Sequence, residues 1–174
     1  KAQIQREFDQ VSRQKMKRGM LDALDKAHSF ELPPTLVDGE FNQIWGQLQQ
    51  EAAREEDPAA ALKEIEDEKE DYRAIAERRV RLGLLLSEIG QANGVQVSAQ
   101  EMEMLIRQAA QQYREQDRQR FVDYVRSEPL AAAQLRAPLY EDKVVDHIVA
   151  GAKVTDKEIG KDDLQKAVEA LDEF

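Results

Sequence analysis

The sequence contains no cysteine, which excludes a disulfide framework, a thiolate nucleophile and a cysteine-ligated zinc site. Aromatic residues make up only 6% of the 174 residues, and there are only eight glycines and five prolines. This composition is typical of long solvated helices rather than of a thick globule. Negative charge also outweighs positive charge, with 35 Asp and Glu against 25 Lys and Arg, a formal net charge of -10 and a pI near 4.8. Nucleic-acid binders need clustered Lys and Arg, so we expect no direct nucleic-acid binding.

Long hydrophobic runs are missing as well. The most apolar stretch, residues 78–89, carries Arg79, Arg81 and Glu88 and is too short and too charged to span a bilayer. Its apolar residues cover most faces of a helix, so we expect other elements to surround it and Leu85→Asp to unfold the domain. No signal peptide is visible, and we expect a cytoplasmic protein. The chain begins at Lys1 inside a helical pattern, which predicts a fragment of a longer protein.

Apolar residues recur at helical spacing along nearly the whole chain, which predicts an all-α fold. Capping boxes are predicted at Ser98–Glu101 and at Thr155–Glu158. Pro138 is expected to begin a further turn. A final short helix would carry Leu164, Val168 and Leu171. Breaks between the helices are expected at Pro33-Pro34, at Asp57-Pro58, from Gly90 to Gly94, at Glu128-Pro129 and at Gly151.

Residues suited to catalysis or metal binding do not gather in any known spacing. His28 and His147 are far apart in sequence, the glycines are scattered singly, and no serine lies in a G-x-S-x-G context. Residues 51–71 hold ten acids against three bases, a pattern typical of a solvated hairpin tip. We therefore expect no catalytic residue, metal or cofactor in this chain.

Apolar helix faces are the remaining candidates for a functional surface. Phe41, Ile44, Trp45 and Leu48 lie on one face of the predicted second helix. Two interpretations stay open for them, since this face can be core or can line an open surface beside a polar segment. Similar stripes are predicted from Met102 to Tyr113 and from Phe121 to Val125. Such surfaces suit the binding of varied apolar chains.

Four blocks of sequence together resemble the C-terminal domain of bacterial trigger factor. The resemblance covers almost the whole chain, with the blocks in the family's order and spacing. The blocks are F-E-L-P-P-T-L-V-D at 30–38, R-R-V-R-L-G-L-L-L-S-E-I at 78–89, R-A-P-L-Y-E-D-K-V-V-D at 136–146 and A-K-V-T-D-K-E at 152–158.

The resemblance implies an ATP-independent chaperone that meets nascent chains at the ribosomal exit tunnel. It implies an elongated all-helical domain over residues 1–174, with a central long helix and two helical arms that form a cradle. Family proteins also carry a ribosome-binding domain and a peptidyl-prolyl isomerase domain, and neither is present in this sequence. We therefore expect this chain to be no enzyme and to reach the ribosome only through the missing domain.

The resemblance also indicates where unfolded or nascent polypeptides would bind. On the second arm the matching positions are Tyr113, Phe121 and Tyr124, joined by Ile106 from the preceding stripe, whereas Ala109 stands where the family can carry a larger apolar residue. The first arm would offer Phe41, Ile44, Trp45 and Leu48. An open apolar cradle also predicts a possible homodimer. Two alternatives stay open: a helical scaffold for one folded partner, and a periplasmic chaperone of the SurA type.

Overall fold

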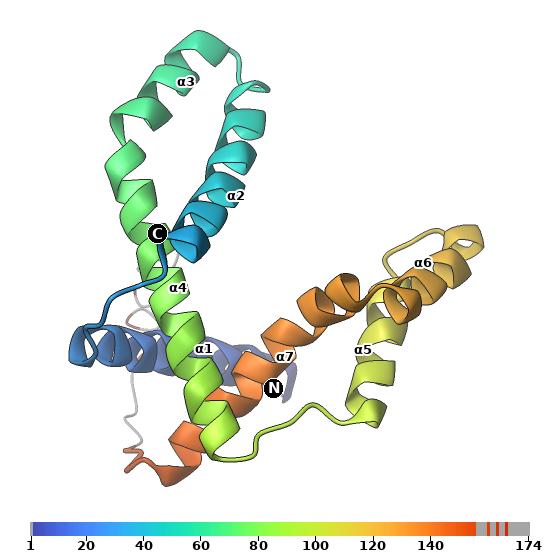
Figure 1. Cartoon of the computed structure of the whole chain (residues 1–174). Coiled ribbons are helices and arrows are strands. Elements are labelled where there is room, and N and C mark those ends of the chain that lie inside the picture. Colours follow the sequence, from blue (N-terminus) through green and yellow to red (C-terminus); the bar gives the residue numbers. More distant parts are fainter. Residues whose placement is uncertain (1, 156–159, 161–162, 164–165, 167–174) are drawn as a thin grey trace. The chain divides into compact units, whose positions relative to one another are not determined.

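The computed structural model describes residues 2–155 together with residues 160, 163 and 166, and every regular element in this part of the chain is an α-helix. The all-α prediction is therefore confirmed for these residues. Within them, seven helices follow one another along the chain, with the labels used in Figure 1. They are α1 (Ala2–Ala27), α2 (Pro34–Ala52), α3 (Pro58–Asp67), α4 (Lys69–Ala92), α5 (Ala99–Ala110), α6 (Glu115–Ser127) and α7 (Pro129–Gly151).

The chain divides into two compact units, and the division falls inside α4. The first unit comprises Lys1–Leu85 with Lys157–Phe174, and the second unit comprises Leu86–Asp156. The helix α4 therefore contributes residues 69–85 to the first unit and residues 86–92 to the second.

Proline and aspartate determine where the helices of the first unit begin. Pro33 is extended, with φ -61° and ψ 117°, and Pro34 starts α2. Amides of the first turn have no acceptor within a helix, so the missing N–H of a proline costs nothing there. Asp57 caps α3, because its side chain accepts a hydrogen bond from the Ala60 amide at 3.1 Å. Both breaks were predicted from the sequence and are confirmed.

Arginines of α4 pair with carboxylates on two other helices of the first unit. The Arg81 guanidinium lies 2.7 Å from Asp25, and both side chains are 22% exposed. Exposed ion pairs stabilise a protein by only about 0–1 kcal/mol each, so these pairs fix the register of α4 more than they add stability. On α1, Asp22 pairs with Arg78 and Asp25 pairs with Arg81. On α2, Asp38 pairs with Arg73 and Glu40 pairs with Arg79.

The apolar run at residues 78–89 lies in the second half of α4 and is less enclosed than its composition predicts. Leu82 is 9% exposed and Leu86 is 3% exposed, whereas Leu85 is half-buried and Gly83 is exposed. The helix therefore buries one stripe rather than most of its faces. We therefore expect a charged substitution to destabilise the fold most at Leu86 and not at Leu85.

Gly90 lies within α4, so the prediction that it helps to end this helix is wrong. The helix continues to Ala92, and Gly94 adopts the left-handed conformation beyond it, with φ 65°. Gly90 is instead buried against α7. A Cβ atom at this position would lie 2.0 Å from Tyr140 Oη and 2.9 Å from Val144 Cγ2. The glycine therefore allows α4 and α7 to approach closely.

Gly90→Ala is expected to lower the free energy of unfolding by about 1 kcal/mol. The added methyl group meets Tyr140 and the fully buried Val144, and overpacking of about 1–3 kcal/mol outweighs the gain of about 1 kcal/mol in helix propensity. Gly83→Ala is the matched control on the same helix, because no atom lies within 4 Å of its Cβ position. Urea unfolding should show the control more stable than the parent by about 0.5–1 kcal/mol. Shifts of the same sign in both variants would refute the close contact.

The second unit is built from the end of α4 and from α5, α6 and α7, and these last three pack on one another. The predicted capping box starts α5: the Ser98 hydroxyl accepts a hydrogen bond from the Glu101 amide at 3.3 Å, and the Glu101 carboxylate accepts one from the Ser98 amide at 2.7 Å. The core consists of apolar side chains that are each at most 5% exposed, namely Leu86, Ile106, Ala110, Val125, Val144 and Val145.

Pro138 does not begin a new turn, because α7 runs through it from Pro129 to Gly151. A proline inside a helix removes one N–H and leaves the carbonyl four residues earlier without its helical partner. Here that residue is Gln134, and both it and Pro138 are exposed, so water can bond the carbonyl. Residues 156–158 of the second predicted capping box, and the final helix predicted around Leu164, Val168 and Leu171, lie outside the described residues.

Candidate functional site

The aromatic face of α2, predicted as part of the first binding patch, packs against α4. The rings of Phe41 and Trp45 stack with their centroids 5.6 Å apart, and Tyr72 of α4 meets Trp45 edge-on at 6.4 Å. Cations lie over both rings, with Lys69 Nζ 4.9 Å from the Trp45 centroid and Arg73 Cζ 5.8 Å from that of Phe41. Both rings are half-buried by these contacts. The structure therefore supports the core interpretation for a large part of this face.

The Tyr72 hydroxyl adds a polar contact to this cluster. It donates a hydrogen bond to Glu68 at 2.9 Å. The bond to the Glu68 carboxylate, together with burial, raises the pKa of Tyr72 above its ordinary value. Tyr72 therefore stays neutral, with its hydroxyl directed to Glu68 between α3 and α4 while its ring packs on Trp45.

Ile44 and Leu48, the other predicted members on α2, are half-buried as well. Leu48 lines a hollow of about 450 Å³ between α2 and α3, together with Ala52, Ala61 and Ile65. Carboxylates of the acid-rich segment surround these apolar side chains, as expected for the solvated hairpin tip predicted from the sequence. They belong to Glu51, Glu55, Glu56, Asp57 and Glu64.

Two predicted residues of the second patch meet at the turn between α5 and α6. The rings of Tyr113 and Phe121 stack with their centroids 4.6 Å apart. Tyr113 does not continue the stripe of α5, since that helix ends at Ala110 and Tyr113 lies in the turn beyond it. The Arg118 Nε–H donates a hydrogen bond to the Tyr113 carbonyl at 3.2 Å and so fixes this turn to α6. Tyr113 keeps 47% of its surface exposed.

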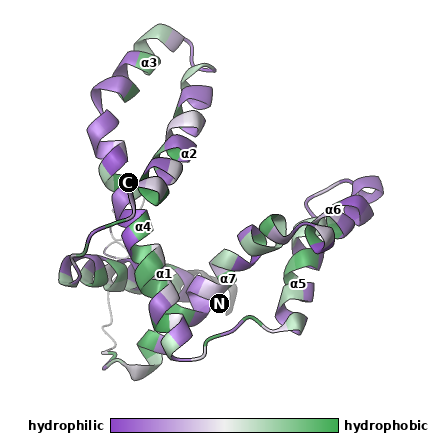
Figure 2. Ribbon diagram, viewed as in Figure 1, coloured by the Kyte–Doolittle hydropathy of each residue, from purple (hydrophilic) through white to green (hydrophobic). Residues whose placement is uncertain are grey.

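Tyr124 lies on α6 and is 57% exposed, whereas Val125 beside it is 2% exposed. Most of α6 is hydrophilic, so its apolar residues form a narrow stripe (Figure 2). Tyr124 therefore lies at the edge of the packed face, and its ring is exposed to solvent. Phe121, one turn earlier, is half-buried beneath Tyr113.

Ile106, predicted as a member of the binding patch on the second arm, is buried in the structure. Its side chain is only 5% exposed, and its helical neighbour Ala110 is buried equally. The stripe of α5 that the sequence shows so clearly is thus the face that packs into the second unit. A polypeptide could contact Ile106 only if α5 moved away from the rest of the unit.

Sequence reasoning missed the two most exposed large apolar side chains of the second unit. Met104 of α5 is 70% exposed and Leu130, at the start of α7, is 66% exposed. The signal for Met104 was present, because it falls between Met102 and Leu105 and hence off the packed stripe. Leu130 follows Pro129, and a residue in a first helical turn has fewer neighbours to cover it.

Ion pairs hold α5 to both α6 and α7. Lys143 Nζ lies 2.7 Å from Glu101, and hydrogen bonds from Lys143 and from the amide and hydroxyl of Ser98 lower the pKa of Glu101 to about 2. Arg126 reaches both carboxylate oxygens of Glu103 at 2.9 Å and lowers the pKa of Glu103, with a smaller contribution from Arg107. Glu101 and Glu103, in the first two turns of α5, therefore fix this helix to α7 and to α6, the helix that carries Tyr124.

We expect the second unit to lose stability in acid through Glu101. Its folded pKa is about 2, against about 4.5 ordinarily, so its contribution is complete above pH 4.5 and disappears as the pH falls toward 2. Urea midpoints of the parent and of Glu101→Gln should therefore differ at pH 7, and the difference should shrink below pH 4.5 and be largely lost by pH 2. Glu88→Gln is the control, because the exposed Glu88 makes no hydrogen bond or ion pair within the described chain. A pH-independent gap for Glu101→Gln would contradict the assignment.

No group of three or more His, Cys, Asp or Glu side chains among the described residues is placed to hold a metal ion. Nor does any helix in the described part of the chain combine the length and apolar character that a membrane span requires.

Comparison with known proteins identifies the family. The family described as "Bacterial trigger factor protein (TF) C-terminus" matches residues 1–150, which is most of the chain. The chain belongs to the trigger factor family. The resemblance seen in the four sequence blocks is therefore confirmed.

Trigger factors of three bacteria are close relatives. The trigger factor of Novosphingobium aromaticivorans is 70% identical over 170 residues, which cover 98% of this chain and 33% of that protein. For Erythrobacter litoralis the identity is 63%, with 98% of this chain and 32% of that protein covered. For Sphingopyxis alaskensis it is 62%, with 99% and 32% covered. The chain thus spans about a third of the length of the trigger factors that it matches.

Proposed function

We propose that this chain is an ATP-independent chaperone module that binds unfolded or nascent polypeptides and limits their aggregation. The observation that carries the proposal is the match to the trigger factor C-terminus over residues 1–150. The exposed rings of Tyr113 and Tyr124 supply a physical basis for it, since exposed apolar surface gains free energy when a client covers it. The proposal assigns no catalysis and no direct ribosome contact to this chain.

The binding surfaces would lie on two helical arms. We assign the first arm to α2 and α3 and the second arm to α5 and α6, so that each unit contributes one arm. Together, residues 1–174 would form one substrate-binding domain, and the cradle expected from the sequence is part of this proposal. Clients would contact Tyr113, Phe121 and Tyr124 on the second arm. On the first arm they would contact the parts of Phe41, Ile44, Trp45 and Leu48 that α3 and α4 leave uncovered.

Each surface would bind weakly by itself. Burial of apolar area is favourable by about 25 cal/mol per Å², so a contact of about 200 Å² gives at most about 5 kcal/mol before the entropy of association is subtracted. Useful affinity therefore requires several contacts along one client. A client held at one surface reaches the next at a high effective concentration, which raises the overall affinity without new contacts.

Light scattering by a chemically denatured client, diluted into buffer without nucleotide, tests the proposal. A stoichiometric excess of this chain should reduce the scattering strongly, whereas a folded protein of similar size should leave it unchanged. Unchanged scattering in the presence of the chain would refute the holding role. Reduction for one client alone, among several unrelated ones, would instead favour a scaffold with one dedicated partner.

The proposal includes a cytoplasmic location and the possibility of a homodimer. Analytical ultracentrifugation over a wide concentration range tests the second of these. A monomer at every concentration would remove the homodimer from the proposal, whereas client binding is tested separately by the scattering assay.

A further inference from the structure

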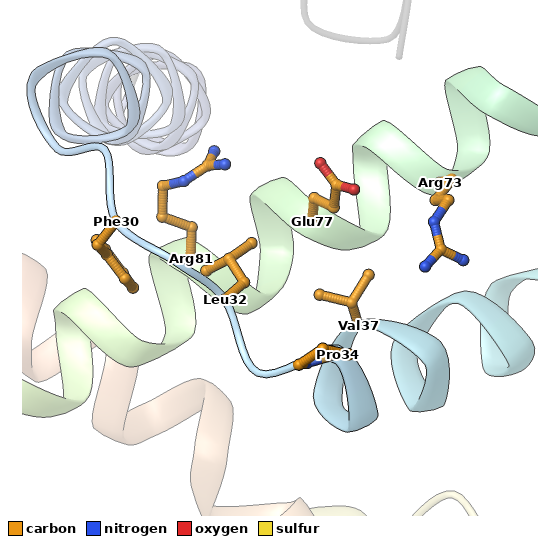
Figure 3. Close-up of a pocket in the computed structure, with 7 residues that line it drawn as sticks. All are labelled: Phe30, Leu32, Pro34, Val37, Arg73, Glu77 and Arg81. Carbon is orange, nitrogen blue, oxygen red and sulfur yellow. The ribbon is translucent and has the colours of Figure 1, made fainter.

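A pocket of about 300 Å³ lies in the first unit between the segment that precedes α2 and the face of α4 (Figure 3). Both arginines that line it are paired, Arg73 with Asp38 at 2.9 Å and Arg81 with Asp25 at 2.7 Å. The lining therefore has no free cation to attract a charged ligand, and we assign none. A reactive group lies instead in the second unit, where α4 ends.

The chain contains two asparagines, and one of them, Asn93, is followed by glycine. Asn93 and Gly94 form the turn that ends α4, and both are exposed. The Gly94 amide donates a hydrogen bond to the Gln91 carbonyl at 3.2 Å. The Val95 amide donates one to the Gly90 carbonyl at 2.8 Å. These two bonds make a Schellman motif, in which Gly94 takes the left-handed conformation with φ 65°.

The Asn93 side chain adds to this helix cap. Its Nδ2 donates a hydrogen bond of 2.7 Å to the Ile89 carbonyl, which also accepts one from the Asn93 amide at 3.1 Å. The carbonyls at the C-terminus of a helix carry a partial negative charge. An amide donor is therefore favourable at this position, and a carboxylate is not.

The same side chain is open to attack by the next peptide nitrogen. In an Asn-Gly pair, no Cβ atom hinders the approach of the glycine nitrogen to the side-chain carbonyl carbon. Helix ends fray and exposed turns open at little cost in free energy, so the hydrogen bond of the Gly94 amide does not hold the turn closed. Asn42, the other asparagine, is also exposed, but it lies within α2 and precedes Gln43. Both its helix and its neighbour oppose the reaction.

We propose that Asn93 is a site of spontaneous deamidation and that its conversion weakens the second unit. The Gly94 nitrogen loses its proton and bonds to Asn93 Cγ, the Cγ–Nδ2 bond breaks, and ammonia leaves a cyclic imide. Water that adds at Cγ gives aspartate. Water that adds at the main-chain carbonyl carbon gives isoaspartate, in which the main chain runs through the side chain and is longer by one methylene group. The reaction requires no client and is independent of the proposed function.

Both products lose the side-chain cap of α4. A carboxylate replaces the amide that donates to Ile89, and it only accepts hydrogen bonds and lies at the negative end of the helix. Isoaspartate also lengthens the connection from α4 to α5, residues 93–98 (Figure 1). The last turns of α4 place Leu86 in the core and Gly90 against Tyr140. A looser end of α4 therefore lowers the stability of the second unit.

Ageing of the whole chain in mildly alkaline buffer at physiological temperature tests the reaction. Peptide mass mapping should show Asn93 converted to a product heavier by one mass unit, at least about tenfold faster than Asn42. Enzymatic methylation of isoaspartate should label the same position. Conversion of Asn93 no faster than that of Asn42 would overturn the proposal.

Variants test the effect on stability. Asn93→Asp should lower the urea midpoint of freshly prepared protein, whereas Asn42→Asp, which adds the same charge at an exposed position of α2, should leave it unchanged. The urea midpoint of the parent should fall on ageing. That of Asn93→Gln should stay constant, because glutamine keeps the amide donor and cyclises far more slowly. An aged parent with Asn93 converted and an unchanged urea midpoint would overturn the proposed weakening of the second unit.

Discussion

Leu86→Asp should remove most of the stability of the second unit, lowering the free energy of unfolding by about 4 kcal/mol or more. Leu86 is 3% exposed and lies where α4 enters this unit. The substitution removes about 1.5–3 kcal/mol of apolar burial and places a carboxyl group among apolar side chains without a partner. Small domains are stable by only about 5–15 kcal/mol. Circular-dichroism melts and urea unfolding would measure the loss.

Leu130→Asp is the matched control in the same unit. Leu130 is 66% exposed in the first turn of α7, where a negative charge interacts favourably with the helix dipole. Its effect should stay within about 0.5 kcal/mol of the parent. A Leu86→Asp protein that melts like the parent would mean that α4 does not contribute to the core of this unit.

Tyr113→Ala combined with Tyr124→Ala should weaken binding of an unfolded client at least about tenfold. Aromatic side chains bury about 150–250 Å² each, and these two are 47% and 57% exposed. Covering the remaining area of one ring is therefore favourable by about 2 kcal/mol, or roughly thirtyfold in affinity. Other contacts along the client make up part of this loss. Fluorescence anisotropy of a labelled, permanently unfolded client would measure the affinity.

The control for this pair is Gln112→Ala combined with Gln116→Ala. Both glutamines are exposed in the same turn and helix, and they offer little apolar area. The melting temperature of the tyrosine variant should fall only slightly, since it loses one stacked pair with Phe121, worth about 0.5–1.5 kcal/mol. Equal affinities for the parent and the tyrosine variant would show that clients bind elsewhere.

Helix boundaries could be predicted from the sequence wherever a local signal sets them. The starts at Pro34 and Pro58 and the cap at Ser98 depend on residues within one turn of the boundary, so the chain around them carries the full signal. Gly90 and Pro138 were misread for the opposite reason. Gly90 serves a contact with α7, and Pro138 is tolerated because its turn is exposed. Both depend on tertiary surroundings.

The candidate site was predictable only in part, because helical spacing shows which residues share a face and not which face is covered. The stripe containing Ile106 proved to be core, while Met104 on the same helix is exposed. Tyr113 was assigned to α5, yet it lies beyond the end of that helix and stacks on Phe121. The pocket next to Arg81 had no sequence signal, since one wall comes from α4 and the other from the segment before α2 together with the first turn of α2.

The central claim is that unfolded polypeptides bind the exposed rings of the second unit while its core stays closed. NMR spectra of the aromatic and methyl groups, recorded while an unfolded client is added, test this claim most directly. We predict progressive shifts for Tyr113 and Tyr124 and unchanged methyl signals for the fully buried Val144 and Val145. Unmoved tyrosine signals at saturating client, or shifts confined to the two valines, would contradict it.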